Sequence, residues 1–126
     1  MSTLPKPLIP QRADPYIHKH TDGYYYFTAS VPAYDGIELR RAKTLEGLAT
    51  ATPKMVWTKP ATGPYSELIW APEIHFNEGA WYVYFAAAPN REINHDLFQH
   101  RMYAISCKGA NPLDGDWDFC GQIETP

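Results

Sequence analysis

Long apolar runs are missing from this sequence of 126 residues. No segment approaches the roughly 18 consecutive apolar residues that a membrane-spanning helix requires. The opening stretch, MSTLPKPLIPQRADP, also lacks the charged start and apolar centre of a secretory leader. We therefore expect a cytoplasmic protein without a membrane partner.

Neither sign of charge dominates the chain. Eleven Lys and Arg residues stand against fourteen Asp and Glu residues, which gives a net charge of -3 with no block of like charge. Proteins that bind nucleic acids usually carry a basic face that attracts phosphates. We therefore expect no nucleic-acid partner.

Cysteine is scarce, since Cys107 and Cys120 are the two that the chain contains. Two cysteines are too few for a disulfide framework, and no Cys/His spacing resembles a zinc site. The simplest interpretation is two reduced thiols in a cytoplasmic protein. A bridge remains an alternative if the two cysteines lie on neighbouring strands.

Aromatic residues and proline are abundant, with nine Tyr, five Phe, four Trp and twelve Pro. Helical periodicity is weak, and TLEGLAT is predicted to form one helical turn at most. Aromatic strands separated by Pro and Gly turns are typical of all-β proteins. An all-β fold is therefore predicted.

The sequence contains an internal repeat. RADPYIHKHTDGYYYFTAS (residues 12–30) returns as WAPEIHFNEGAWYVYFAAA (residues 70–88). Each copy predicts a short strand, a tight turn at Asp-Gly or Glu-Gly, and an aromatic strand. After a length difference in the turn, the sequence alignment pairs Tyr24, Tyr26 and Phe27 with Tyr82, Tyr84 and Phe85.

Each copy continues into two further predicted strands. These are GIELRRAKT (36–44), KMVWTKP (54–60), HRMYAISCK (100–108) and WDFCGQI (117–123), with ATGPYSEL as a connector. Repeats of four antiparallel strands are typical of β-propeller blades. We predict one partial propeller domain, with blade one at about 11–62 and blade two at about 68–126. Two blades leave open faces, so we expect missing blades in a longer protein, or self-association.

The repeat differs at one chemically important position, because Ala71 stands where Asp14 stood. The first strands of propeller blades surround one axis, so their starts meet near one mouth of the ring. An acid in one copy alone is consistent with a catalytic carboxylate aimed into that mouth. The alternative is an Asp-Pro turn in which the side chain bonds nearby backbone amides.

Three segments resemble glycoside hydrolase family 43, in particular its α-L-arabinofuranosidase and exo-1,5-arabinan-trimming branch. They are the ADP opening, IELRRAKTLEGL and IWAPEIH. The resemblance implies a five-bladed β-propeller, of which this chain forms the N-terminal two blades. It implies no redox cofactor, and calcium or halide ions in the central channel of some members, although no residue here identifies an ion site.

The resemblance also implies catalytic roles. The family's general base opens the first strand of the first blade and maps onto Asp14. Its general acid, a Glu, and a second Asp that tunes the acid's pKa lie in later blades, beyond Pro126. We therefore expect this chain alone to be inactive.

Three further residues are predicted to bind substrate. Trp70 adjoins the Asp14-equivalent position, and its indole is suited to the apolar face of a sugar. Glu73 lies on the same strand, and Tyr34 lies in a loop that follows the first aromatic strand. The alternatives are core packing for Trp70, a structural ion pair for Glu73 and a solvated loop for Tyr34.

The remaining candidates favour structure. His18 and His75 match between the repeats, which favours packing or strand-to-strand hydrogen bonds over metal binding. The aromatic strands YYYF and YVYF are predicted to form core between the blades. His95 and His100 flank a polar loop and are predicted to be exposed.

The predicted function is inverting hydrolysis of terminal α-L-arabinofuranosyl linkages in arabino-oligosaccharides. A β-xylosidase of the same family, acting on xylose-containing oligosaccharides, is one alternative. A noncatalytic carbohydrate-binding module or a structural propeller fragment is another.

Overall fold

The computed structural model describes residues 13–91, 93–94, 97–98 and 100–123. Within them lie two four-stranded antiparallel sheets, one two-stranded hairpin and one helical turn, so the all-β prediction is confirmed. The strands are β1 (Ala13–Lys19), β2 (Tyr25–Ser30), β3 (Gly36–Ala42), β4 (Lys54–Thr58), β5 (Glu67–Asn77), β6 (Ala80–Ala88), β7 (Ile93–Asn94), β8 (Leu97–Phe98), β9 (Arg101–Cys107) and β10 (Asp118–Ile123). The helical turn is α1 (Gly47–Thr50), as TLEGLAT predicted.

The first sheet follows the chain in the order β1-β2-β3-β4, and the second has the order β10-β9-β6-β5. The turn between β5 and β6 consists of Glu78 and Gly79, whose φ values are 51° and 82°. Positive φ at both central residues is the geometry of tight hairpins, and glycine adopts it without a steric penalty. The repeat's turn prediction is therefore confirmed.

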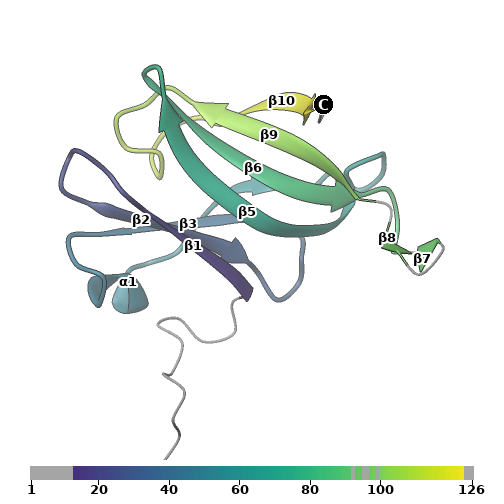
Figure 1. The fold of residues 1–126 in the computed structure, drawn as a ribbon, viewed down its shortest axis with the longest axis horizontal. Helices are drawn as coiled ribbons and strands as arrows, with labels where there is room; N and C mark the ends of the chain where they lie inside the picture. Colours follow the sequence, from purple (N-terminus) through teal and green to yellow (C-terminus); the bar gives the residue numbers. More distant parts are fainter. Residues whose placement is uncertain (1–12, 92, 95–96, 99, 124–126) are drawn as a thin grey trace, which may run out of the picture.

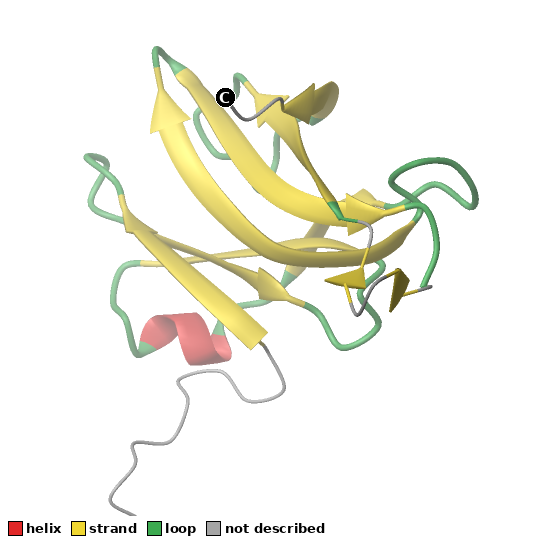
Figure 2. Ribbon diagram, turned by 45° about the vertical axis from the view of Figure 1, so that its right-hand side comes forward, coloured by secondary structure: helices red, strands yellow, loops and turns green. Residues whose placement is uncertain are grey.

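The two sheets lie face to face, with β5 crossing over β1 and β2, while α1 covers the opposite side of the first sheet (Figures 1 and 2). The core between the sheets contains Tyr26, Val83 and Phe85, as predicted from the aromatic strands. Phe27 departs from that prediction, because it packs with Leu48 beside α1. Neighbouring residues on a strand point to opposite faces, so Tyr26 and Phe27 cannot share one core.

The strand pairing matches the second strands of the two repeats differently from the sequence alignment, by two residues. Ile17 lies opposite Phe27, whereas Ile74 lies opposite Val83. Val83, rather than Phe85, therefore takes the place of Phe27. The alignment misplaced this strand because the β1–β2 loop is longer than the two-residue β5–β6 turn. A displacement of two residues preserves the face of each side chain.

The segment between β6 and β9 also differs from the prediction of a polar loop. It contains the short hairpin β7–β8, in which Ile93 pairs with Phe98 and Asn94 with Leu97. Strands of two residues are too short to show an alternating pattern in sequence.

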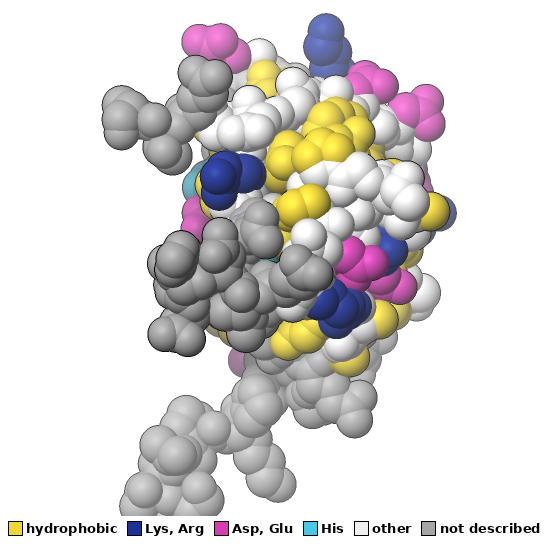
Figure 3. All heavy atoms as spheres, turned by 90° about the vertical axis from the view of Figure 1, so that its right-hand side faces the viewer, with side chains coloured by type: hydrophobic (Ala, Val, Ile, Leu, Met, Phe, Trp, Pro, Cys, Tyr) yellow, Lys and Arg dark blue, Asp and Glu magenta, His cyan; other side chains and the backbone are white. Residues whose placement is uncertain are grey.

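The described surface mixes charges. On the face that Figure 3 shows, Lys and Arg side chains and Asp and Glu side chains both lie among hydrophobic groups. No helix in the described part of the chain is long and apolar enough to cross a membrane. Cys107 is buried and Cys120 is exposed, and both thiols are free, although they lie on the adjacent strands β9 and β10.

Candidate functional site

The candidate site lies where two strand pairings, one in each sheet, are irregular at matching positions. We call this end of the two sheets the mouth. The pairing of β1 with β2 shifts register between Ala13 and Tyr16, and that of β5 with β6 shifts between Trp70 and Glu73. Asp14 and Ala71, which lie inside these two shifts, both have φ of 51°. Such bulges bend a strand and change the direction of a side chain. The two strands therefore present repeat-equivalent side chains with similar local backbone.

Between the two irregularities lies a cleft of about 230 Å³. The residues that line it come in equal number from each strand: Asp14, Pro15 and Tyr16 from β1, and Ala71, Pro72 and Glu73 from β5. Asp14 and Glu73 are both exposed. The structure thus brings two of the four predicted site residues into one solvent-accessible cleft.

The carboxylate of Asp14 is bonded to a residue that sequence reasoning missed. The Ser30 hydroxyl donates a hydrogen bond to Asp14 Oδ2, with an O–O distance of 3.3 Å. Ser30 Oγ in turn accepts a hydrogen bond of 2.7 Å from the backbone N–H of Ala71. The acid on the first sheet is thereby connected to the matching position on the second.

Glu73 belongs to a chain of polar contacts that crosses from β5 to β1. One carboxylate oxygen, Oε1, lies 3.3 Å from His75 Nε2, and His75 Nδ1 lies 3.5 Å from the Tyr16 hydroxyl. The Glu73 side chain remains 56% exposed. It is therefore accessible to a ligand while its position is restrained by the imidazole.

Trp70 and Tyr34 contact each other but do not line this cleft. Their rings are 5.8 Å apart in an edge-to-face arrangement, and His100 stacks on the indole at 3.9 Å. His100 was predicted to be exposed, but it is half-buried, and its Nε2 lies 3.0 Å from the Leu68 carbonyl. Burial lowers its pKa, and the Leu68 contact opposes that effect. His95 lies outside the described residues.

Backbone hydrogen bonds fasten the Tyr34 loop both to β5 of the second sheet and to the residue that follows β4 of the first. The Tyr34 carbonyl accepts from the Ile69 N–H at 3.0 Å, and the Asp35 carbonyl accepts from the Lys59 N–H at 2.9 Å. These contacts set Tyr34 beside Trp70. The sequence placed both residues near the mouth, but it gave no sign that they form one aromatic group.

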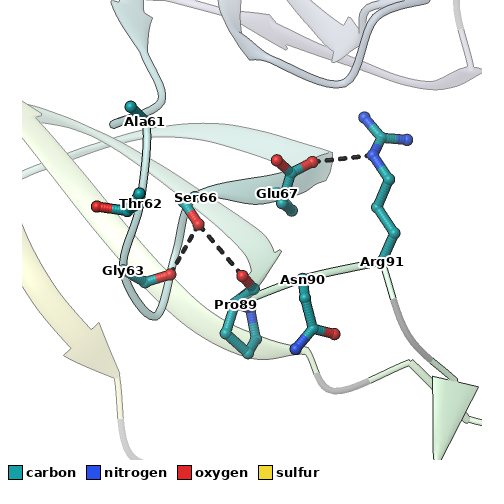
Figure 4. A pocket seen from close by; sticks show the side chains of 8 residues that line it. All are labelled: Ala61, Thr62, Gly63, Ser66, Glu67, Pro89, Asn90 and Arg91. Carbon is teal, nitrogen blue, oxygen red and sulfur yellow. Dashed lines mark hydrogen bonds and ion pairs between the residues drawn. The ribbon is translucent and has the colours of Figure 1, made fainter.

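A larger cleft of about 380 Å³ lies between the connector that precedes β5 and the end of β6 (Figure 4). Its one carboxylate, Glu67, lies 2.9 Å from Arg91 Nε and 3.7 Å from Lys59 Nζ. The Ser66 hydroxyl bonds the carbonyls of Gly63 and Pro89. A carboxylate between two cations is held in an ion pair and is poorly suited to activating water.

A third cleft, also of about 380 Å³, is lined by residues that include Asp22 and Arg41. Burial would raise the pKa of Asp22, but hydrogen bonds from the Tyr26 hydroxyl and the Tyr24 N–H lower it below its usual value. The same surroundings raise the pKa of Tyr26 to about 12, through burial first and the Asp22 bond second. Arg41 also stacks on the Tyr24 ring at 3.4 Å. These contacts tie the β1–β2 hairpin to β3, which is a structural role.

His18, the repeat counterpart of His75, packs against His20 and Trp81. His18 Nε2 lies 3.3 Å from His20 Nδ1, and the His18 ring meets Trp81 edge-on at 5.6 Å. Burial is the largest cause that lowers the pKa of His18, followed by the neighbouring His20 and His75. Across the described residues, no group of three or more His, Cys, Asp or Glu side chains is placed to hold a metal ion.

Comparisons with known proteins agree with the repeat and the fold. The family model described as "Glycosyl hydrolases family 43" matches residues 4–126. The extracellular exo-α-(1→5)-L-arabinofuranosidase of Streptomyces avermitilis is 57% identical over 98% of this chain and 25% of its own length. An enzyme of the same name from Streptomyces chartreusis is 49% identical over 94% of this chain and 35% of its own length.

A solved structure extends the similarity to the fold. The crystal structure of an α-L-arabinofuranosidase from Lactobacillus brevis matches with a TM-score of 0.89 and 59% identity, over 95% of this chain and 38% of the crystallised one. The chain therefore spans between a quarter and about two fifths of the length of these relatives. Its two sheets correspond to part of a larger β-propeller.

The prediction of a cytoplasmic protein is wrong, because both Streptomyces relatives are named extracellular enzymes. That prediction relied on the absence of a secretory-leader pattern in the first residues and, in addition, on the presence of only two cysteines. A core built from side chains such as Trp81, Tyr26 and Phe85, each at most 1% exposed, does not depend on disulfides. Few cysteines are therefore compatible with either compartment.

Proposed function

Because the chain belongs to glycosyl hydrolases family 43, we propose that it is the part of an inverting α-L-arabinofuranosidase that carries the general base, Asp14. The substrate is a terminal α-L-arabinofuranosyl group of an arabino-oligosaccharide. The names of the three relatives support the substrate class. One observation carries the role of Asp14: it is an exposed carboxylate in a cleft at the mouth, where the matching residue is Ala71.

Inverting hydrolysis requires two carboxyl groups on opposite sides of the scissile bond. One deprotonates the attacking water while the other protonates the leaving oxygen, at a separation of roughly 6.5 to 9.5 Å. An ionised carboxylate has about four acceptor positions. Asp14 accepts one hydrogen bond from the Ser30 hydroxyl and is otherwise exposed, so it retains capacity to bind and deprotonate a water molecule.

In this proposal substrate contacts come from Glu73 on the second wall of the cleft and from the aromatic pair beside the cleft. Glu73 accepts hydrogen bonds from sugar hydroxyls, while Trp70 and Tyr34 present aromatic surface beside the mouth. The general acid and the second Asp come from blades beyond the two at about 11–62 and 68–126. The chain alone therefore lacks half of the required acid–base pair.

The decisive experiment completes the enzyme. In the chimera, this chain replaces the matching 38% of the Lactobacillus brevis arabinofuranosidase. We expect the chimera to hydrolyse an aryl α-L-arabinofuranoside, and the isolated chain to show no turnover. A correctly folded chimera without activity, alongside an active Lactobacillus brevis parent, would contradict the proposal.

The role of Asp14 is tested in the chimera by Asp14→Asn. Removing the base should lower kcat by about a thousandfold or more, within the usual range for general-base catalysis, while KM changes little. Asp114→Asn is the matched control, because that carboxylate accepts a hydrogen bond from Asn111 in an outer loop. If Asp14→Asn retained near-normal kcat, Asp14 would not be the base.

A further inference from the structure

We propose that Ser30 is a positioning residue that orients the Asp14 carboxylate toward the attacking water. This inference rests on the proposed function of Asp14 as the base. The decisive feature is a hydrogen-bond chain that runs from the second sheet to the catalytic carboxylate of the first. It consists of the Ala71 N–H, the Ser30 hydroxyl and Asp14 Oδ2.

The geometry determines where the hydroxyl proton of Ser30 points. Its oxygen accepts the Ala71 N–H at 2.7 Å, which occupies one lone pair and fixes the oxygen. A serine hydroxyl has one proton to donate, and Asp14 Oδ2 lies 3.3 Å away to receive it. Since the carboxylate accepts this hydrogen bond, one of its oxygens is restrained and the rotation of the group is limited.

Ser30 is well placed to restrain its partner. It ends β2, an interior strand of the first sheet, and it is 2% exposed, whereas Asp14 is exposed. A general base has to lie within hydrogen-bond reach of the water that it deprotonates. A buried hydroxyl anchored to the neighbouring sheet provides that restraint without shielding the carboxylate from solvent.

The repeat supplies an independent observation. Ser30 pairs with Ala13 immediately before the register shift, and in the second sheet Ala86 pairs with Trp70 at the corresponding place. The structural counterparts of Asp14 and Ser30 are therefore Ala71 and Ala86. Where the acid is absent, the hydroxyl is absent too, as expected if the hydroxyl serves the acid.

A purely structural role for Ser30 is the competing explanation. A backbone N–H away from water needs an acceptor, and Ser30 provides one for Ala71. That role predicts a loss of stability when the hydroxyl is removed, without a specific effect on the catalytic step. The two explanations therefore differ in kcat and in their dependence on Asp14.

The test uses Ser30→Ala in the chimera, assayed with a fluorogenic aryl arabinofuranoside. Loss of one hydrogen bond to a charged group should lower kcat by about tenfold, with KM within about twofold of the unsubstituted chimera. Ser30→Thr, which keeps a hydroxyl, should restore most of the activity. In an Asp14→Asn background, Ser30→Ala should cause little further loss, because the residue acts through the carboxylate.

The matched control is Thr28→Val, two residues earlier on the same face of β2. The Thr28 hydroxyl is also buried, but it donates to the Glu38 carbonyl at 2.9 Å and not to Asp14. This variant should lower the melting temperature and leave kcat per folded molecule unchanged.

Each outcome has a defined meaning. An unchanged kcat per folded molecule in Ser30→Ala, or an equal loss in the Asp14→Asn background, would overturn the positioning role. An inactive but folded unsubstituted chimera, or full activity in Asp14→Asn, would instead overturn the proposed function itself. Melting curves of every variant separate misfolding from loss of catalysis.

Discussion

The two walls of the cleft, on β1 and β5, have a similar backbone conformation but different side chains. Asp14 and Ala71 each precede a proline, lie in a register shift and have φ of 51°. A left-handed backbone costs a residue other than glycine about 1 to 2 kcal/mol. That an alanine adopts it without a catalytic reason indicates that the surrounding sheet imposes the conformation. The repeat therefore fixes the scaffold, and a pair of polar side chains distinguishes one wall.

The most severe test of this comparison moves the acid from one wall to the other. We expect the double variant Asp14→Ala/Ala71→Asp to lose at least about a thousandfold in kcat, as a missing base does. The reason is that a carboxylate on the second wall approaches the sugar from another direction, and its own sheet places Ala86 where the first sheet places Ser30. Steady-state kinetics of the chimera measures the effect.

Ala71→Asp alone is the control for that experiment, since it shows whether the second wall tolerates a carboxylate. Recovery of the double variant to within about tenfold of normal kcat would show that the two walls are interchangeable. In that case, location in the cleft rather than direction would decide which residue acts as base.

A smaller effect is expected from the aromatic group beside the second wall. Trp70→Ala should raise KM by about tenfold, equivalent to about 1.4 kcal/mol of binding, and change kcat by less than about threefold. Trp117→Ala is the comparison, since that indole donates to the Pro112 carbonyl away from the mouth. A lower melting temperature with unchanged KM for Trp70→Ala would instead make Trp70 a core residue.

The smallest predicted effect concerns pH and the contact between the sheets. Because folding lowers the pKa of His18 below its usual value of 6.5, this residue contributes stability above that pH. The contribution is lost as the pH falls through the lowered pKa, since the unfolded chain binds the proton more readily.

His18→Gln should therefore reduce the acid sensitivity of the chimera between pH 7 and pH 5. We expect the melting temperature of the variant to fall by roughly 2 °C less than that of the unsubstituted chimera over this range. Calorimetry at the two pH values measures the difference. Identical pH dependence would show that His18 does not contribute to the acid response.

The fold was largely readable from the sequence because turns and aromatic strands are local signals. The strand expected at 54–60 is present as Lys54–Thr58, and that expected at 117–123 as Asp118–Ile123. The register of the second hairpin was not readable, because loop length and strand pairing together set it. The alignment therefore matched Phe27 to Phe85 instead of Val83.

The candidate site was only partly predictable, for a related reason. The asymmetry between Asp14 and Ala71 is visible in one line of sequence. Ser30 became relevant only through its pairing register and its contact with the second sheet, because strand pairing and not the sequence alignment identifies Ala86 as its counterpart. The stacking of His100 on Trp70 joins the segment before β9 to β5, and no local sequence pattern reports such a contact.

The backbone contacts of the Tyr34 loop have an evolutionary consequence. Two successive carbonyls, those of Tyr34 and Asp35, bind the N–H groups of Ile69 and Lys59 and so fasten both ends of the connector between the sheets. The connector between these two hydrogen bonds can lengthen, shorten or change composition while the sheets keep their relative placement. Diversification of this connector is thereby uncoupled from the architecture of the two sheets.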